Sequence, residues 1–326
     1  MKGYLVSMLL FCIACGSAPK QKAIEILEKG TKDGSVIVRV QAAEGLARVG
    51  RTQYMGMLYT IIEDGDRVGM AAALTSLCEL QVKTYSPIVV SLTEHTDPLI
   101  RTEAYRLISV MDDDRCRDVL IKGAYDALAK IRMISYDGLE KFQDKDAIFD
   151  GLRDVDPLVR IAAAQALGRM GEQEMKDFVH NEMNGEENDV WCHSVIALAE
   201  MGDTSVIPDI RSRLFSAPWG VRLAAVEALL IMKIHDGVLV LQEALQSDDP
   251  FAREHAVNIL KKYEISETTQ LLKGVVYDEY INVSVASIEA LVQYGTKEEQ
   301  RLFAELMEAP NPLVQIAAAA AYLQGE

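Results

Sequence analysis

The side chains that build metal centres and acid–base pairs are few and scattered in this sequence. The histidines are His95, His180, His193, His235 and His255. A metal site needs several imidazole, thiolate or carboxylate groups within ~2 Å of one ion, and the short-range clusters that would supply them are absent. A phosphate-binding glycine loop and a G-x-S-x-G nucleophile turn are also absent. The sequence therefore predicts no metal, no cofactor and no catalytic residue.

The cysteines do not form an evident reactive set. Cys12 and Cys15 make a C-x-x-C pair, but the strand–helix unit that accompanies this motif in redox proteins does not follow. Cys78, Cys116 and Cys192 are an odd number and lie far apart along the chain. We expect these three to be small buried or half-buried side chains in helices, without a disulfide framework.

The N-terminus has the character of an export signal. Lys2 supplies a short basic start, and residues 4–14 form an apolar run. This run is too short to span a bilayer, which takes ~20 residues. We expect a signal peptide over residues 1–14 and a short tether over residues 15–19. A secretory peptide cleaved nearby and an uncleaved apolar helix are the alternatives.

The end of this segment resembles the lipobox of bacterial lipoproteins, in which a cysteine is acylated after the leader is removed. Ala14 precedes Cys15 as a small residue should, whereas Cys12 stands where the motif usually has leucine. The resemblance implies lipid attachment at Cys15 and a position in the bacterial cell envelope, on the periplasmic or surface face. Gly16 is not the aspartate that retains enteric lipoproteins, so the outer membrane is favoured.

From residue 20 onward one unit recurs along the chain. Residues 156–171 contain a helix-capping Asp156, Pro157 at the first helical position and a closing Gly171. Aligned on Arg160, the equivalent positions follow at intervals of 31 residues with one step of 28: Arg39, Met70, Arg101, Arg132, Arg160, Trp191, Arg222, Arg253, Ser284 and Gln315. The position three residues later is alanine or serine in every copy: Ala42, Ala73, Ala104, Ser135, Ala163, Ser194, Ala225, Ala256, Ser287 and Ala318. A large apolar residue follows a turn later: Leu46, Leu77, Ile108, Leu139, Leu167, Leu198, Leu229, Leu260, Leu291 and Tyr322. Two such columns in register indicate a repeat protein.

Each repeat is predicted to consist of two helices, the second of which carries the aligned position. The first helices are expected at 20–29, 53–63, 87–95, 115–125, 144–152, 173–183, 205–215, 237–246, 267–277 and 297–308. No strand pattern is present. A helix pair of this size does not bury its apolar faces alone, so neighbouring repeats must stack. We expect residues 20–326 to form one continuous all-α solenoid of about ten repeats.

Composition limits the class of partner. The chain has 326 residues, of which 49% are hydrophobic but only 6% aromatic, so alanine sets the spacing between helices. Its formal net charge is −16. Such a surface repels phosphate backbones, because nucleic-acid affinity comes mostly from counterion release by lysine and arginine. We expect no nucleic-acid partner, and contact with a membrane only through the lipid anchor.

The unit D-P-x-V-R-x-x-A-A-x-A-L-G-x-x-G resembles HEAT repeats, and specifically the short HEAT-like repeats of the phycobilisome-lyase type. Its Asp and Arg are carried by Asp97 and Arg101, Asp156 and Arg160, and Asp249 and Arg253. The departures at the arginine position are Met70, Trp191, Ser284 and Gln315. The resemblance covers residues 20–326 and implies a right-handed αα-superhelix. It says little about function, since this architecture serves scaffolds, adaptors and some enzymes.

Enzymes that share this architecture offer a comparison. Deoxyhypusine hydroxylases of this fold hold iron with His-Glu dipeptides, and no His-Glu dipeptide occurs here. His193 and His255 share a column but lie two repeats apart, roughly 20 Å, which is too far for one ion. Lyase activity on a protein-bound prosthetic group is implied only by the family name. We expect a non-enzymatic scaffold, and keep a lyase-like or chaperone-like enzyme and a purely structural lipoprotein as alternatives.

The expected binding surface is the concave side lined by the second helices. Residues one, five and nine places after the aligned position project away from the alanine stripe. They predict a protein-binding or peptide-binding groove with an apolar centre and charged flanks: Met133, Ile161, Arg169, Trp191, Ile196, Leu223, Glu227 and Ile231. Exposed apolar side chains bordered by charge mark partner surfaces. Some of these residues can equally pack in the core, and Trp191 and Trp219 can be either binding anchors or packed side chains.

Overall fold

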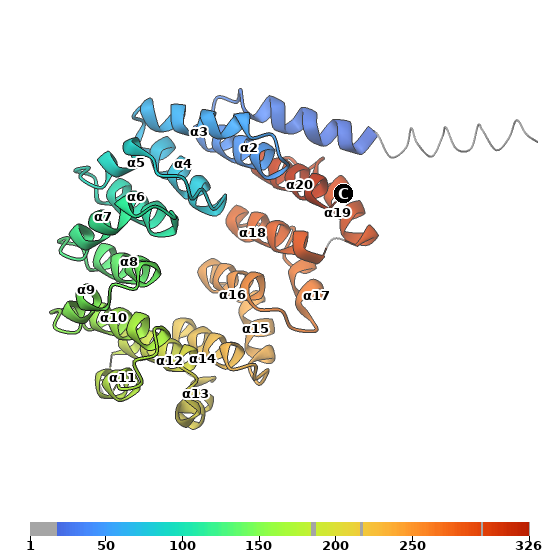
Figure 1. The fold of residues 1–326 in the computed structure, drawn as a ribbon. Coiled ribbons are helices and arrows are strands. Elements are labelled where there is room, and N and C mark those ends of the chain that lie inside the picture. The colour runs from blue at the N-terminus through green and yellow to red at the C-terminus, as the bar shows by residue number, and fades with distance from the viewer. Residues whose placement is uncertain (1–17, 184–186, 216–217, 295, 326) are drawn as a thin grey trace, which may run out of the picture. The chain divides into compact units, whose positions relative to one another are not determined.

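A computed structural model describes residues 18–183, 187–215, 218–294 and 296–325 of the chain (Figure 1). Every regular element in these ranges is a helix, so the predicted all-α repeat fold is confirmed. None of these helices is both long and apolar enough to cross a bilayer. The predicted signal peptide, Cys15 and residues 15–17 of the predicted tether lie outside the described ranges. Residues 18 and 19, assigned to the tether, belong to the first helix, which covers residues 18–30.

The second helix of every repeat begins three residues before the aligned position. These helices are α2 (Val36–Arg48), α4 (Arg67–Glu79), α6 (Pro98–Val110), α8 (Ala129–Leu139), α10 (Pro157–Arg169), α12 (Asn188–Glu200), α14 (Trp219–Ile231), α16 (Pro250–Lys262), α18 (Ile281–Leu291) and α20 (Pro312–Gln324). Local chemistry fixes many of these starts. The Asp156 carboxylate accepts a hydrogen bond from the Leu158 N–H at 2.9 Å, and Asp97, Asp249 and Asn311 cap their helices in the same way.

The first helices also lie close to their predicted positions. Besides residues 18–30 they are α3 (Gln53–Glu63), α5 (Pro87–Leu92), α7 (Arg115–Gly123), α9 (Lys145–Gly151), α11 (Met175–Met183), α13 (Ile207–Arg213), α15 (Val238–Leu245), α17 (Thr268–Lys273) and α19 (Lys297–Leu306). Short 3-10 turns η1 (Glu140–Phe142), η2 (Thr204–Val206) and η3 (Val292–Tyr294) complete the chain. The 28-residue step runs through η1 into the seven residues of α9. Helices α5, α13 and α17 are equally short or shorter in repeats of 31 residues, so the length of the first helix alone does not account for the missing residues.

The alanine and serine column is the innermost row of the structure. All ten of its members have 0% of their surface exposed. Nine members of the large apolar column are equally buried, and Tyr322 is half-buried. Small side chains let neighbouring helices approach, and the larger residue a turn below fills the remaining volume. The two columns therefore form the core that stacking was predicted to create.

In the described part of the chain, six second helices are followed by a left-handed residue at one fixed position, eleven places after the aligned one. Glycine serves at Gly50, Gly171 and Gly202, with φ of 84°, 95° and 69°. Gln81, Gln143 and Lys233 adopt φ of 52°, 54° and 61° at the equivalent place. A residue with a Cβ is disfavoured in this conformation, so three repeats hold their turn against the local preference.

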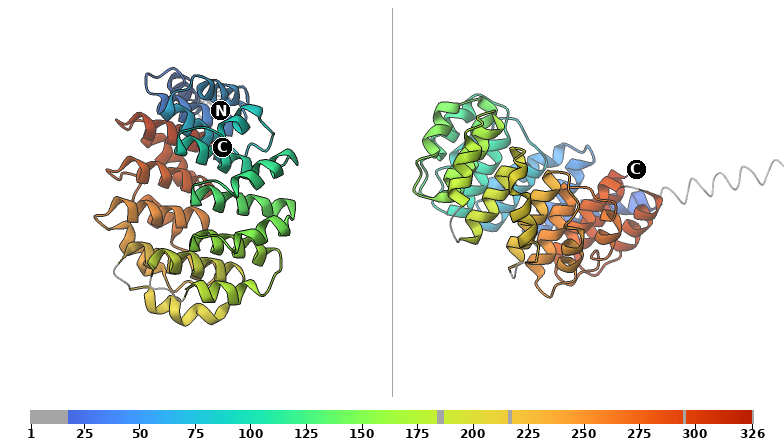
Figure 2. Two further views of the ribbon diagram at one scale, coloured as in Figure 1. Left: turned by 90° about the vertical axis from the view of Figure 1, so that its left-hand side faces the viewer. Right: turned by 90° about the horizontal axis from the view of Figure 1, so that it is seen from below.

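The chain divides into two compact units. Unit 2 is Gln81–Ile265, and unit 1 combines Met1–Leu80 with Ser266–Glu326. Within unit 2, consecutive second helices from α6 to α16 pack side by side in one layer, and the first helices from α5 to α15 form the other (Figure 2). Within unit 1, α2 packs against α4, α18 packs against α20, and α20 packs against α2. The first and last repeats are therefore direct neighbours, which the sequence pattern did not predict.

Candidate functional site

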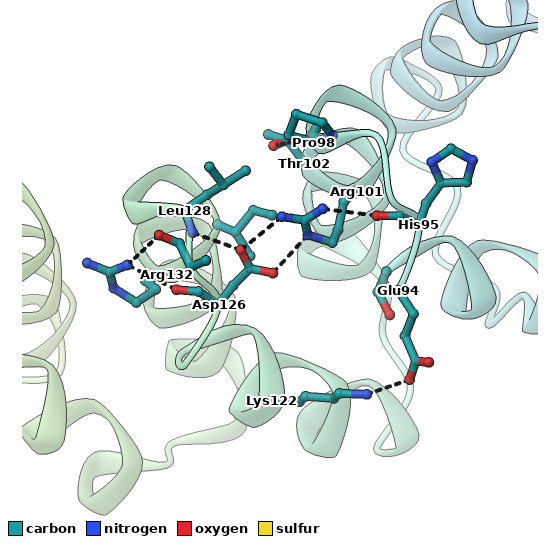
Figure 3. Close-up of polar contacts among 12 residues, drawn as sticks. Glu94, His95, Pro98, Arg101, Thr102, Lys122, Asp126, Leu128 and Arg132 are labelled. Atoms are coloured by element: carbon teal, nitrogen blue, oxygen red, sulfur yellow. Dashed lines mark hydrogen bonds and ion pairs between the residues drawn. The ribbon is translucent and has the colours of Figure 1, made fainter.

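Several motif arginines make contacts between repeats. Arg101 donates from Nε and Nη2 to the Asp126 carboxylate of the next repeat, at 2.9 and 3.3 Å (Figure 3). Arg132 makes the same pair with Asp154 at 2.7 Å for both bonds. Paired parallel bonds of this kind hold a guanidinium firmly in place. We call this inter-repeat contact the staple.

In six repeats the staple has a second half within the repeat itself. The aligned side chain there also donates to the backbone carbonyl six residues earlier, just after the first helix. The carbonyl acceptors are those of Asp33 for Arg39, His95 for Arg101, Asp126 for Arg132, Asp154 for Arg160, Ser247 for Arg253 and Ala309 for Gln315. Carbonyls at a helix end otherwise lack a backbone partner. Gln315 thus replaces arginine at this contact, and the motif position is structural.

Trp191, predicted as a possible anchor, also replaces a motif arginine. Its indole Nε1–H donates to Asp209 Oδ2 at 2.7 Å, in the next first helix, and the Arg213 guanidinium lies 4.5 Å from the ring centre. Only 1% of Trp191 is exposed. The side chain makes the inter-repeat bond of the staple with a different donor. It therefore offers no surface to a partner, and the core interpretation applies.

The remaining predicted groove residues fall into three groups. Ile161 and Leu223 are buried in the core. The face of each second helix that contacts neighbouring helices is wider than the helical spacing of the alanine column predicted. Met133, Ile196 and Ile231 are half-buried. Arg169 and Glu227 take part in ion pairs between second helices. The predicted apolar centre is thus smaller than expected, and its accessible members lie beside charged groups.

Arg169 is the centre of the largest of these polar groups. Its guanidinium donates to Glu140 at 2.7 Å, to Glu200 at 2.9 Å and to Asp137. Gln165 donates to the same Glu200 carboxylate at 2.7 Å. Burial of the guanidinium acts in the opposite direction, but the three carboxylates outweigh it and raise the pKa of Arg169. We call Asp137, Glu140, Gln165, Arg169 and Glu200 the Arg169 cluster; its formal charges are three negative and one positive.

A pocket of about 480 Å³ lies in unit 2 between α6, α7 and the loop before α6 (Figure 3). Its volume is within the range of small-molecule sites. Its lining consists of Thr93, Glu94, His95, Thr96, Arg101, Tyr105, Lys122, Tyr125 and Asp126. The sequence pattern does not predict this pocket, because its residues come from two repeats and share no common motif.

The charged groups of the pocket are already paired. Lys122 pairs with Glu94, and Arg101 pairs with Asp126. His95 Nδ1 accepts the Asp97 N–H at 3.0 Å, so the neutral ring carries its proton on Nε2. Burial raises the pKa of Tyr105, whose hydroxyl is bonded to Thr93. The other tyrosine of the lining, Tyr125, donates its hydroxyl to Asp150 Oδ2 at 3.2 Å.

One other cluster has the residue types of a catalytic triad. His180 Nε2 lies 2.9 Å from Asp203 Oδ2 and 3.4 Å from the Ser205 hydroxyl. In a triad the acid orients one ring nitrogen while the serine bonds the other. Here both partners use the same nitrogen, and Asp203 also caps the Ser205 N–H. The arrangement is therefore a turn contact between repeats and not a nucleophile–base relay.

The other histidines do not gather around a metal. His193 Nδ1–H donates within its own helix to the Asp189 carbonyl at 2.9 Å. Burial lowers the pKa of His255, which is half-buried in α16. Over the described ranges, no set of three or more histidine, cysteine, aspartate and glutamate residues is placed to bind a metal ion.

Comparison with known proteins identifies the repeat. The HEAT repeats family profile matches residues 177–261, and the HEAT repeat profile matches residues 146–173. A search of curated proteins gave no significant match.

Several solved structures are similar to this chain at low sequence identity. The complex of CpcE and CpcF of phycocyanin lyase from Nostoc sp. PCC7120 is 16% identical with a TM-score of 0.48, over 72% of this chain and 95% of that one. Human deoxyhypusine hydroxylase in complex with glycerol is 16% identical with a TM-score of 0.34, over 77% and 95%. Kap121p bound to Pho4p is 15% identical with a TM-score of 0.37, over 90% and 41%. With the two profile matches and the stacked helix pairs, the chain contains HEAT repeats, and its described part is an all-α HEAT-like solenoid.

Proposed function

We propose that this chain is a non-catalytic scaffold that binds a protein or peptide partner along the second helices of unit 2. The observation that carries the proposal is the Arg169 cluster, where three carboxylates share one guanidinium. Ile196 and Ile231 remain half-buried on the neighbouring helices α12 and α14. The surface thus combines surplus negative charge with accessible apolar side chains, as partner surfaces do.

Charge defines the kind of partner. One guanidinium neutralises only part of the charge of Asp137, Glu140 and Glu200, and the whole chain carries a formal charge of −16. Complementary charge steers partners together and selects among them. We therefore expect the partner segment to carry lysine or arginine beside an apolar residue. Its binding should weaken as salt is added, because partly exposed charges are screened.

The engagement of polar groups supports a non-enzymatic role. The aligned column holds repeats together, the His180 cluster closes a turn, and the charges of the pocket are paired with one another. A catalytic site needs titratable groups with perturbed pKa values directed into one cavity. The polar groups of the Arg169 cluster instead lie in a row across three consecutive repeats, which suits an extended partner.

Site-specific photocrosslinking tests this surface. A photoreactive phenylalanine at Ile196 should capture a partner in envelope extracts, because this side chain is half-buried at the proposed surface. The same group at Asp177, exposed on the first helix α11, is the matched control and should capture little. The captured segment should be basic, and its yield should fall with added salt.

The opposite pattern would contradict the proposed surface. If Asp177 captured the same partner with equal or greater yield, the first-helix layer would be the binding side. Trp191 and Leu223 are unsuitable for this test, because both are buried and their substitution changes stability first.

We further propose that the N-terminus anchors the scaffold by a lipid on Cys15, with the bacterial outer membrane as the favoured location. The lipobox-like Ala14-Cys15 supports this, and the helix over residues 18–30 leaves a tether of very few residues. Radiolabelled palmitate should enter the intact chain and should not enter a Cys15→Ser variant. Equal labelling of both proteins would refute the anchor without affecting the binding surface.

A further inference from the structure

The two ends of the chain pack on each other inside unit 1. Helix α2 of the first repeat lies directly against helix α20 of the last one. Consecutive second helices elsewhere in the chain make the same kind of side-by-side contact, for example α18 with α20. We call the α2–α20 contact, together with the adjoining helix over residues 18–30, the end joint.

The helices of the end joint approach each other closely because small residues lie between them. A Cβ placed on Gly45 of α2 would lie 3.0 Å from the Ala320 Cβ of α20. A Cβ on Gly30 would lie 3.0 Å from the Ile316 Cδ1 and 2.8 Å from the Ala42 Cβ. Few side-chain contacts are this short, so both positions require glycine for the observed spacing. Packing of this closeness is typical of a protein interior.

The last repeat has the composition of a covered helix. Alone among the second helices, α20 carries no charged residue. Ala320 occupies a column, five places after the aligned position, that is polar in eight of the other nine repeats. Residues 316–321 of α20 are all buried. The terminal repeat of an open array needs a polar outer face for solubility, and α20 lacks one.

Charged groups border the apolar contact. Lys22 of the first helix pairs with Glu308, which follows α19. The charge of Glu289 in α18 acts on Glu44 and on Arg48 in α2. The joint is thus apolar at its centre and charged at its border, as protein interfaces generally are.

We infer that the two ends of this chain act as each other's cap, and that the end joint keeps the exposed end faces of the repeats from binding a second copy. Each end face alone would be an apolar helix surface ready to receive another repeat. The partner that covers it is the opposite end of the same chain. Opening the joint would expose both faces and lead to association between copies, since exchanged ends restore the same contacts.

Zero-length crosslinking of the unaltered protein tests this inference. A carbodiimide joins an amine to a carboxylate only when the two are in contact, so it should link Lys22 to Glu308. The reaction is run on an equal mixture of ¹⁴N-labelled and ¹⁵N-labelled protein, and linked peptides are identified by mass spectrometry. We expect light–light and heavy–heavy products only. Mixed products would show that the joint forms between two copies, and the absence of any link would show that it does not form; either result overturns the inference.

A charge placed inside the joint tests its consequence. Ala320→Arg should raise hydrogen exchange of the α2 and α20 amides by at least about tenfold and should produce dimers or larger species by light scattering. Asn258→Arg is the matched control, since it adds the same charge at the same column in an exposed position of α16. The inference fails if Ala320→Arg leaves both amide protection and mass equal to those of the control. Amide hydrogen exchange in α10 and α12 of unit 2 should be unchanged, which shows that the variant remains folded.

Discussion

Arg132 and Asp154 lie in consecutive repeats and are joined by two hydrogen bonds of 2.7 Å each. Only 12% and 11% of these two side chains are exposed. Burial acts to raise the pKa of the Asp154 carboxyl, but the Arg132 guanidinium and the Asp156 N–H outweigh it and lower that pKa. A third bond runs from Arg132 to the Asp126 carbonyl, so one side chain connects a helix end, a turn and the next repeat.

The first prediction concerns this pair. Arg132→Ala should lower the free energy of unfolding by about 3 kcal/mol, because it leaves a largely buried carboxylate without its partner. Arg132→Lys should recover little of this, since one ammonium does not reproduce two parallel bonds. Urea denaturation followed by circular dichroism measures both. Arg39→Ala is the control; Arg39 donates to two backbone carbonyls, and its loss should cost less. Equal losses at the two positions would show that the carboxylate pair adds nothing.

Much of this architecture can be predicted from the sequence, because it follows from short-range periodicity. The alanine or serine column and the start of every second helix follow from residue type and interval alone. A further column of aspartates is also visible in the sequence, although it was not predicted to be structural. Asp33, Asp126, Asp154 and Asp278 stand six places before the aligned position, and each accepts the N–H two residues later. Two of them also accept the preceding repeat's arginine.

The candidate site was less predictable, because burial depends on neighbours that a helical period does not specify. Ile161 and Leu223 occupy an outward column by phase, yet adjacent helices cover them. Trp191 was ambiguous until its bond to Asp209 was seen. The end joint links positions almost a full chain length apart, so no interval reveals it. The uncharged sequence of α20 was its one visible sign.

The second prediction separates the structural role of Trp191 from a binding role. Trp191→Phe removes the indole N–H and leaves Asp209 without that donor. We expect a loss of about 1–3 kcal/mol in the free energy of unfolding, as for a hydrogen bond to a charged group. Photocrosslinking from Ile196 should be unchanged below the unfolding transition. Trp219→Phe is the control, since Trp219 is half-buried and stacks on Arg222 at 4.2 Å. A stable Trp191→Phe variant that lost crosslinking would support the anchor interpretation instead.

The third prediction uses the left-handed turn column. Gln143 holds φ at 54°, where Gly171 of the next repeat holds 95°. Gln143→Gly should raise the free energy of unfolding by up to about 1 kcal/mol, because the strain of a Cβ in this region is relieved while the unfolded chain gains some entropy. Gly171→Ala should lower it by about 1 kcal/mol. Thermal unfolding compares the two, and a destabilised Gln143→Gly would mean that side-chain contacts outweigh the backbone strain.

The fourth prediction concerns pH. Glu299, with 1% of its side chain exposed, pairs with Lys273 at 2.6 Å and accepts the Thr296 N–H at 3.0 Å. Burial acts to raise the pKa of Glu299, but Lys273 and Thr296 outweigh it and lower the pKa from the ordinary 4.5. A lowered folded pKa gives stability that is present above pH 4.5 and is lost as pH falls through the folded value.

The matching measurement is the urea midpoint of wild type and Glu299→Gln between pH 3 and pH 7. The variant should be less stable at pH 7, and the difference should shrink below pH 4.5 as the wild-type carboxyl takes up a proton. Glu298→Gln is the control, because Glu298 contacts the same Lys273 with 80% of its side chain exposed. A difference between wild type and Glu299→Gln that stayed constant with pH would exclude the ionised carboxylate as its source.

The fifth prediction concerns the charge balance of the Arg169 cluster. Arg169→Gln leaves Asp137, Glu140 and Glu200 close together without the guanidinium that separates their charges. Like charges at short range repel, so the variant should be less stable than wild type at pH 7. Glu200→Gln should change the charge balance in the opposite direction, because it removes one surplus negative charge and leaves Arg169 with two carboxylates. We expect it to be close to wild type in stability and to bind the basic partner more weakly, with a shallower salt dependence. Urea denaturation at pH 7 and crosslinking yield from Ile196 across salt measure the two effects separately. If Glu200→Gln bound the partner as tightly as wild type at every salt concentration, the surplus charge of the cluster would have no part in recognition.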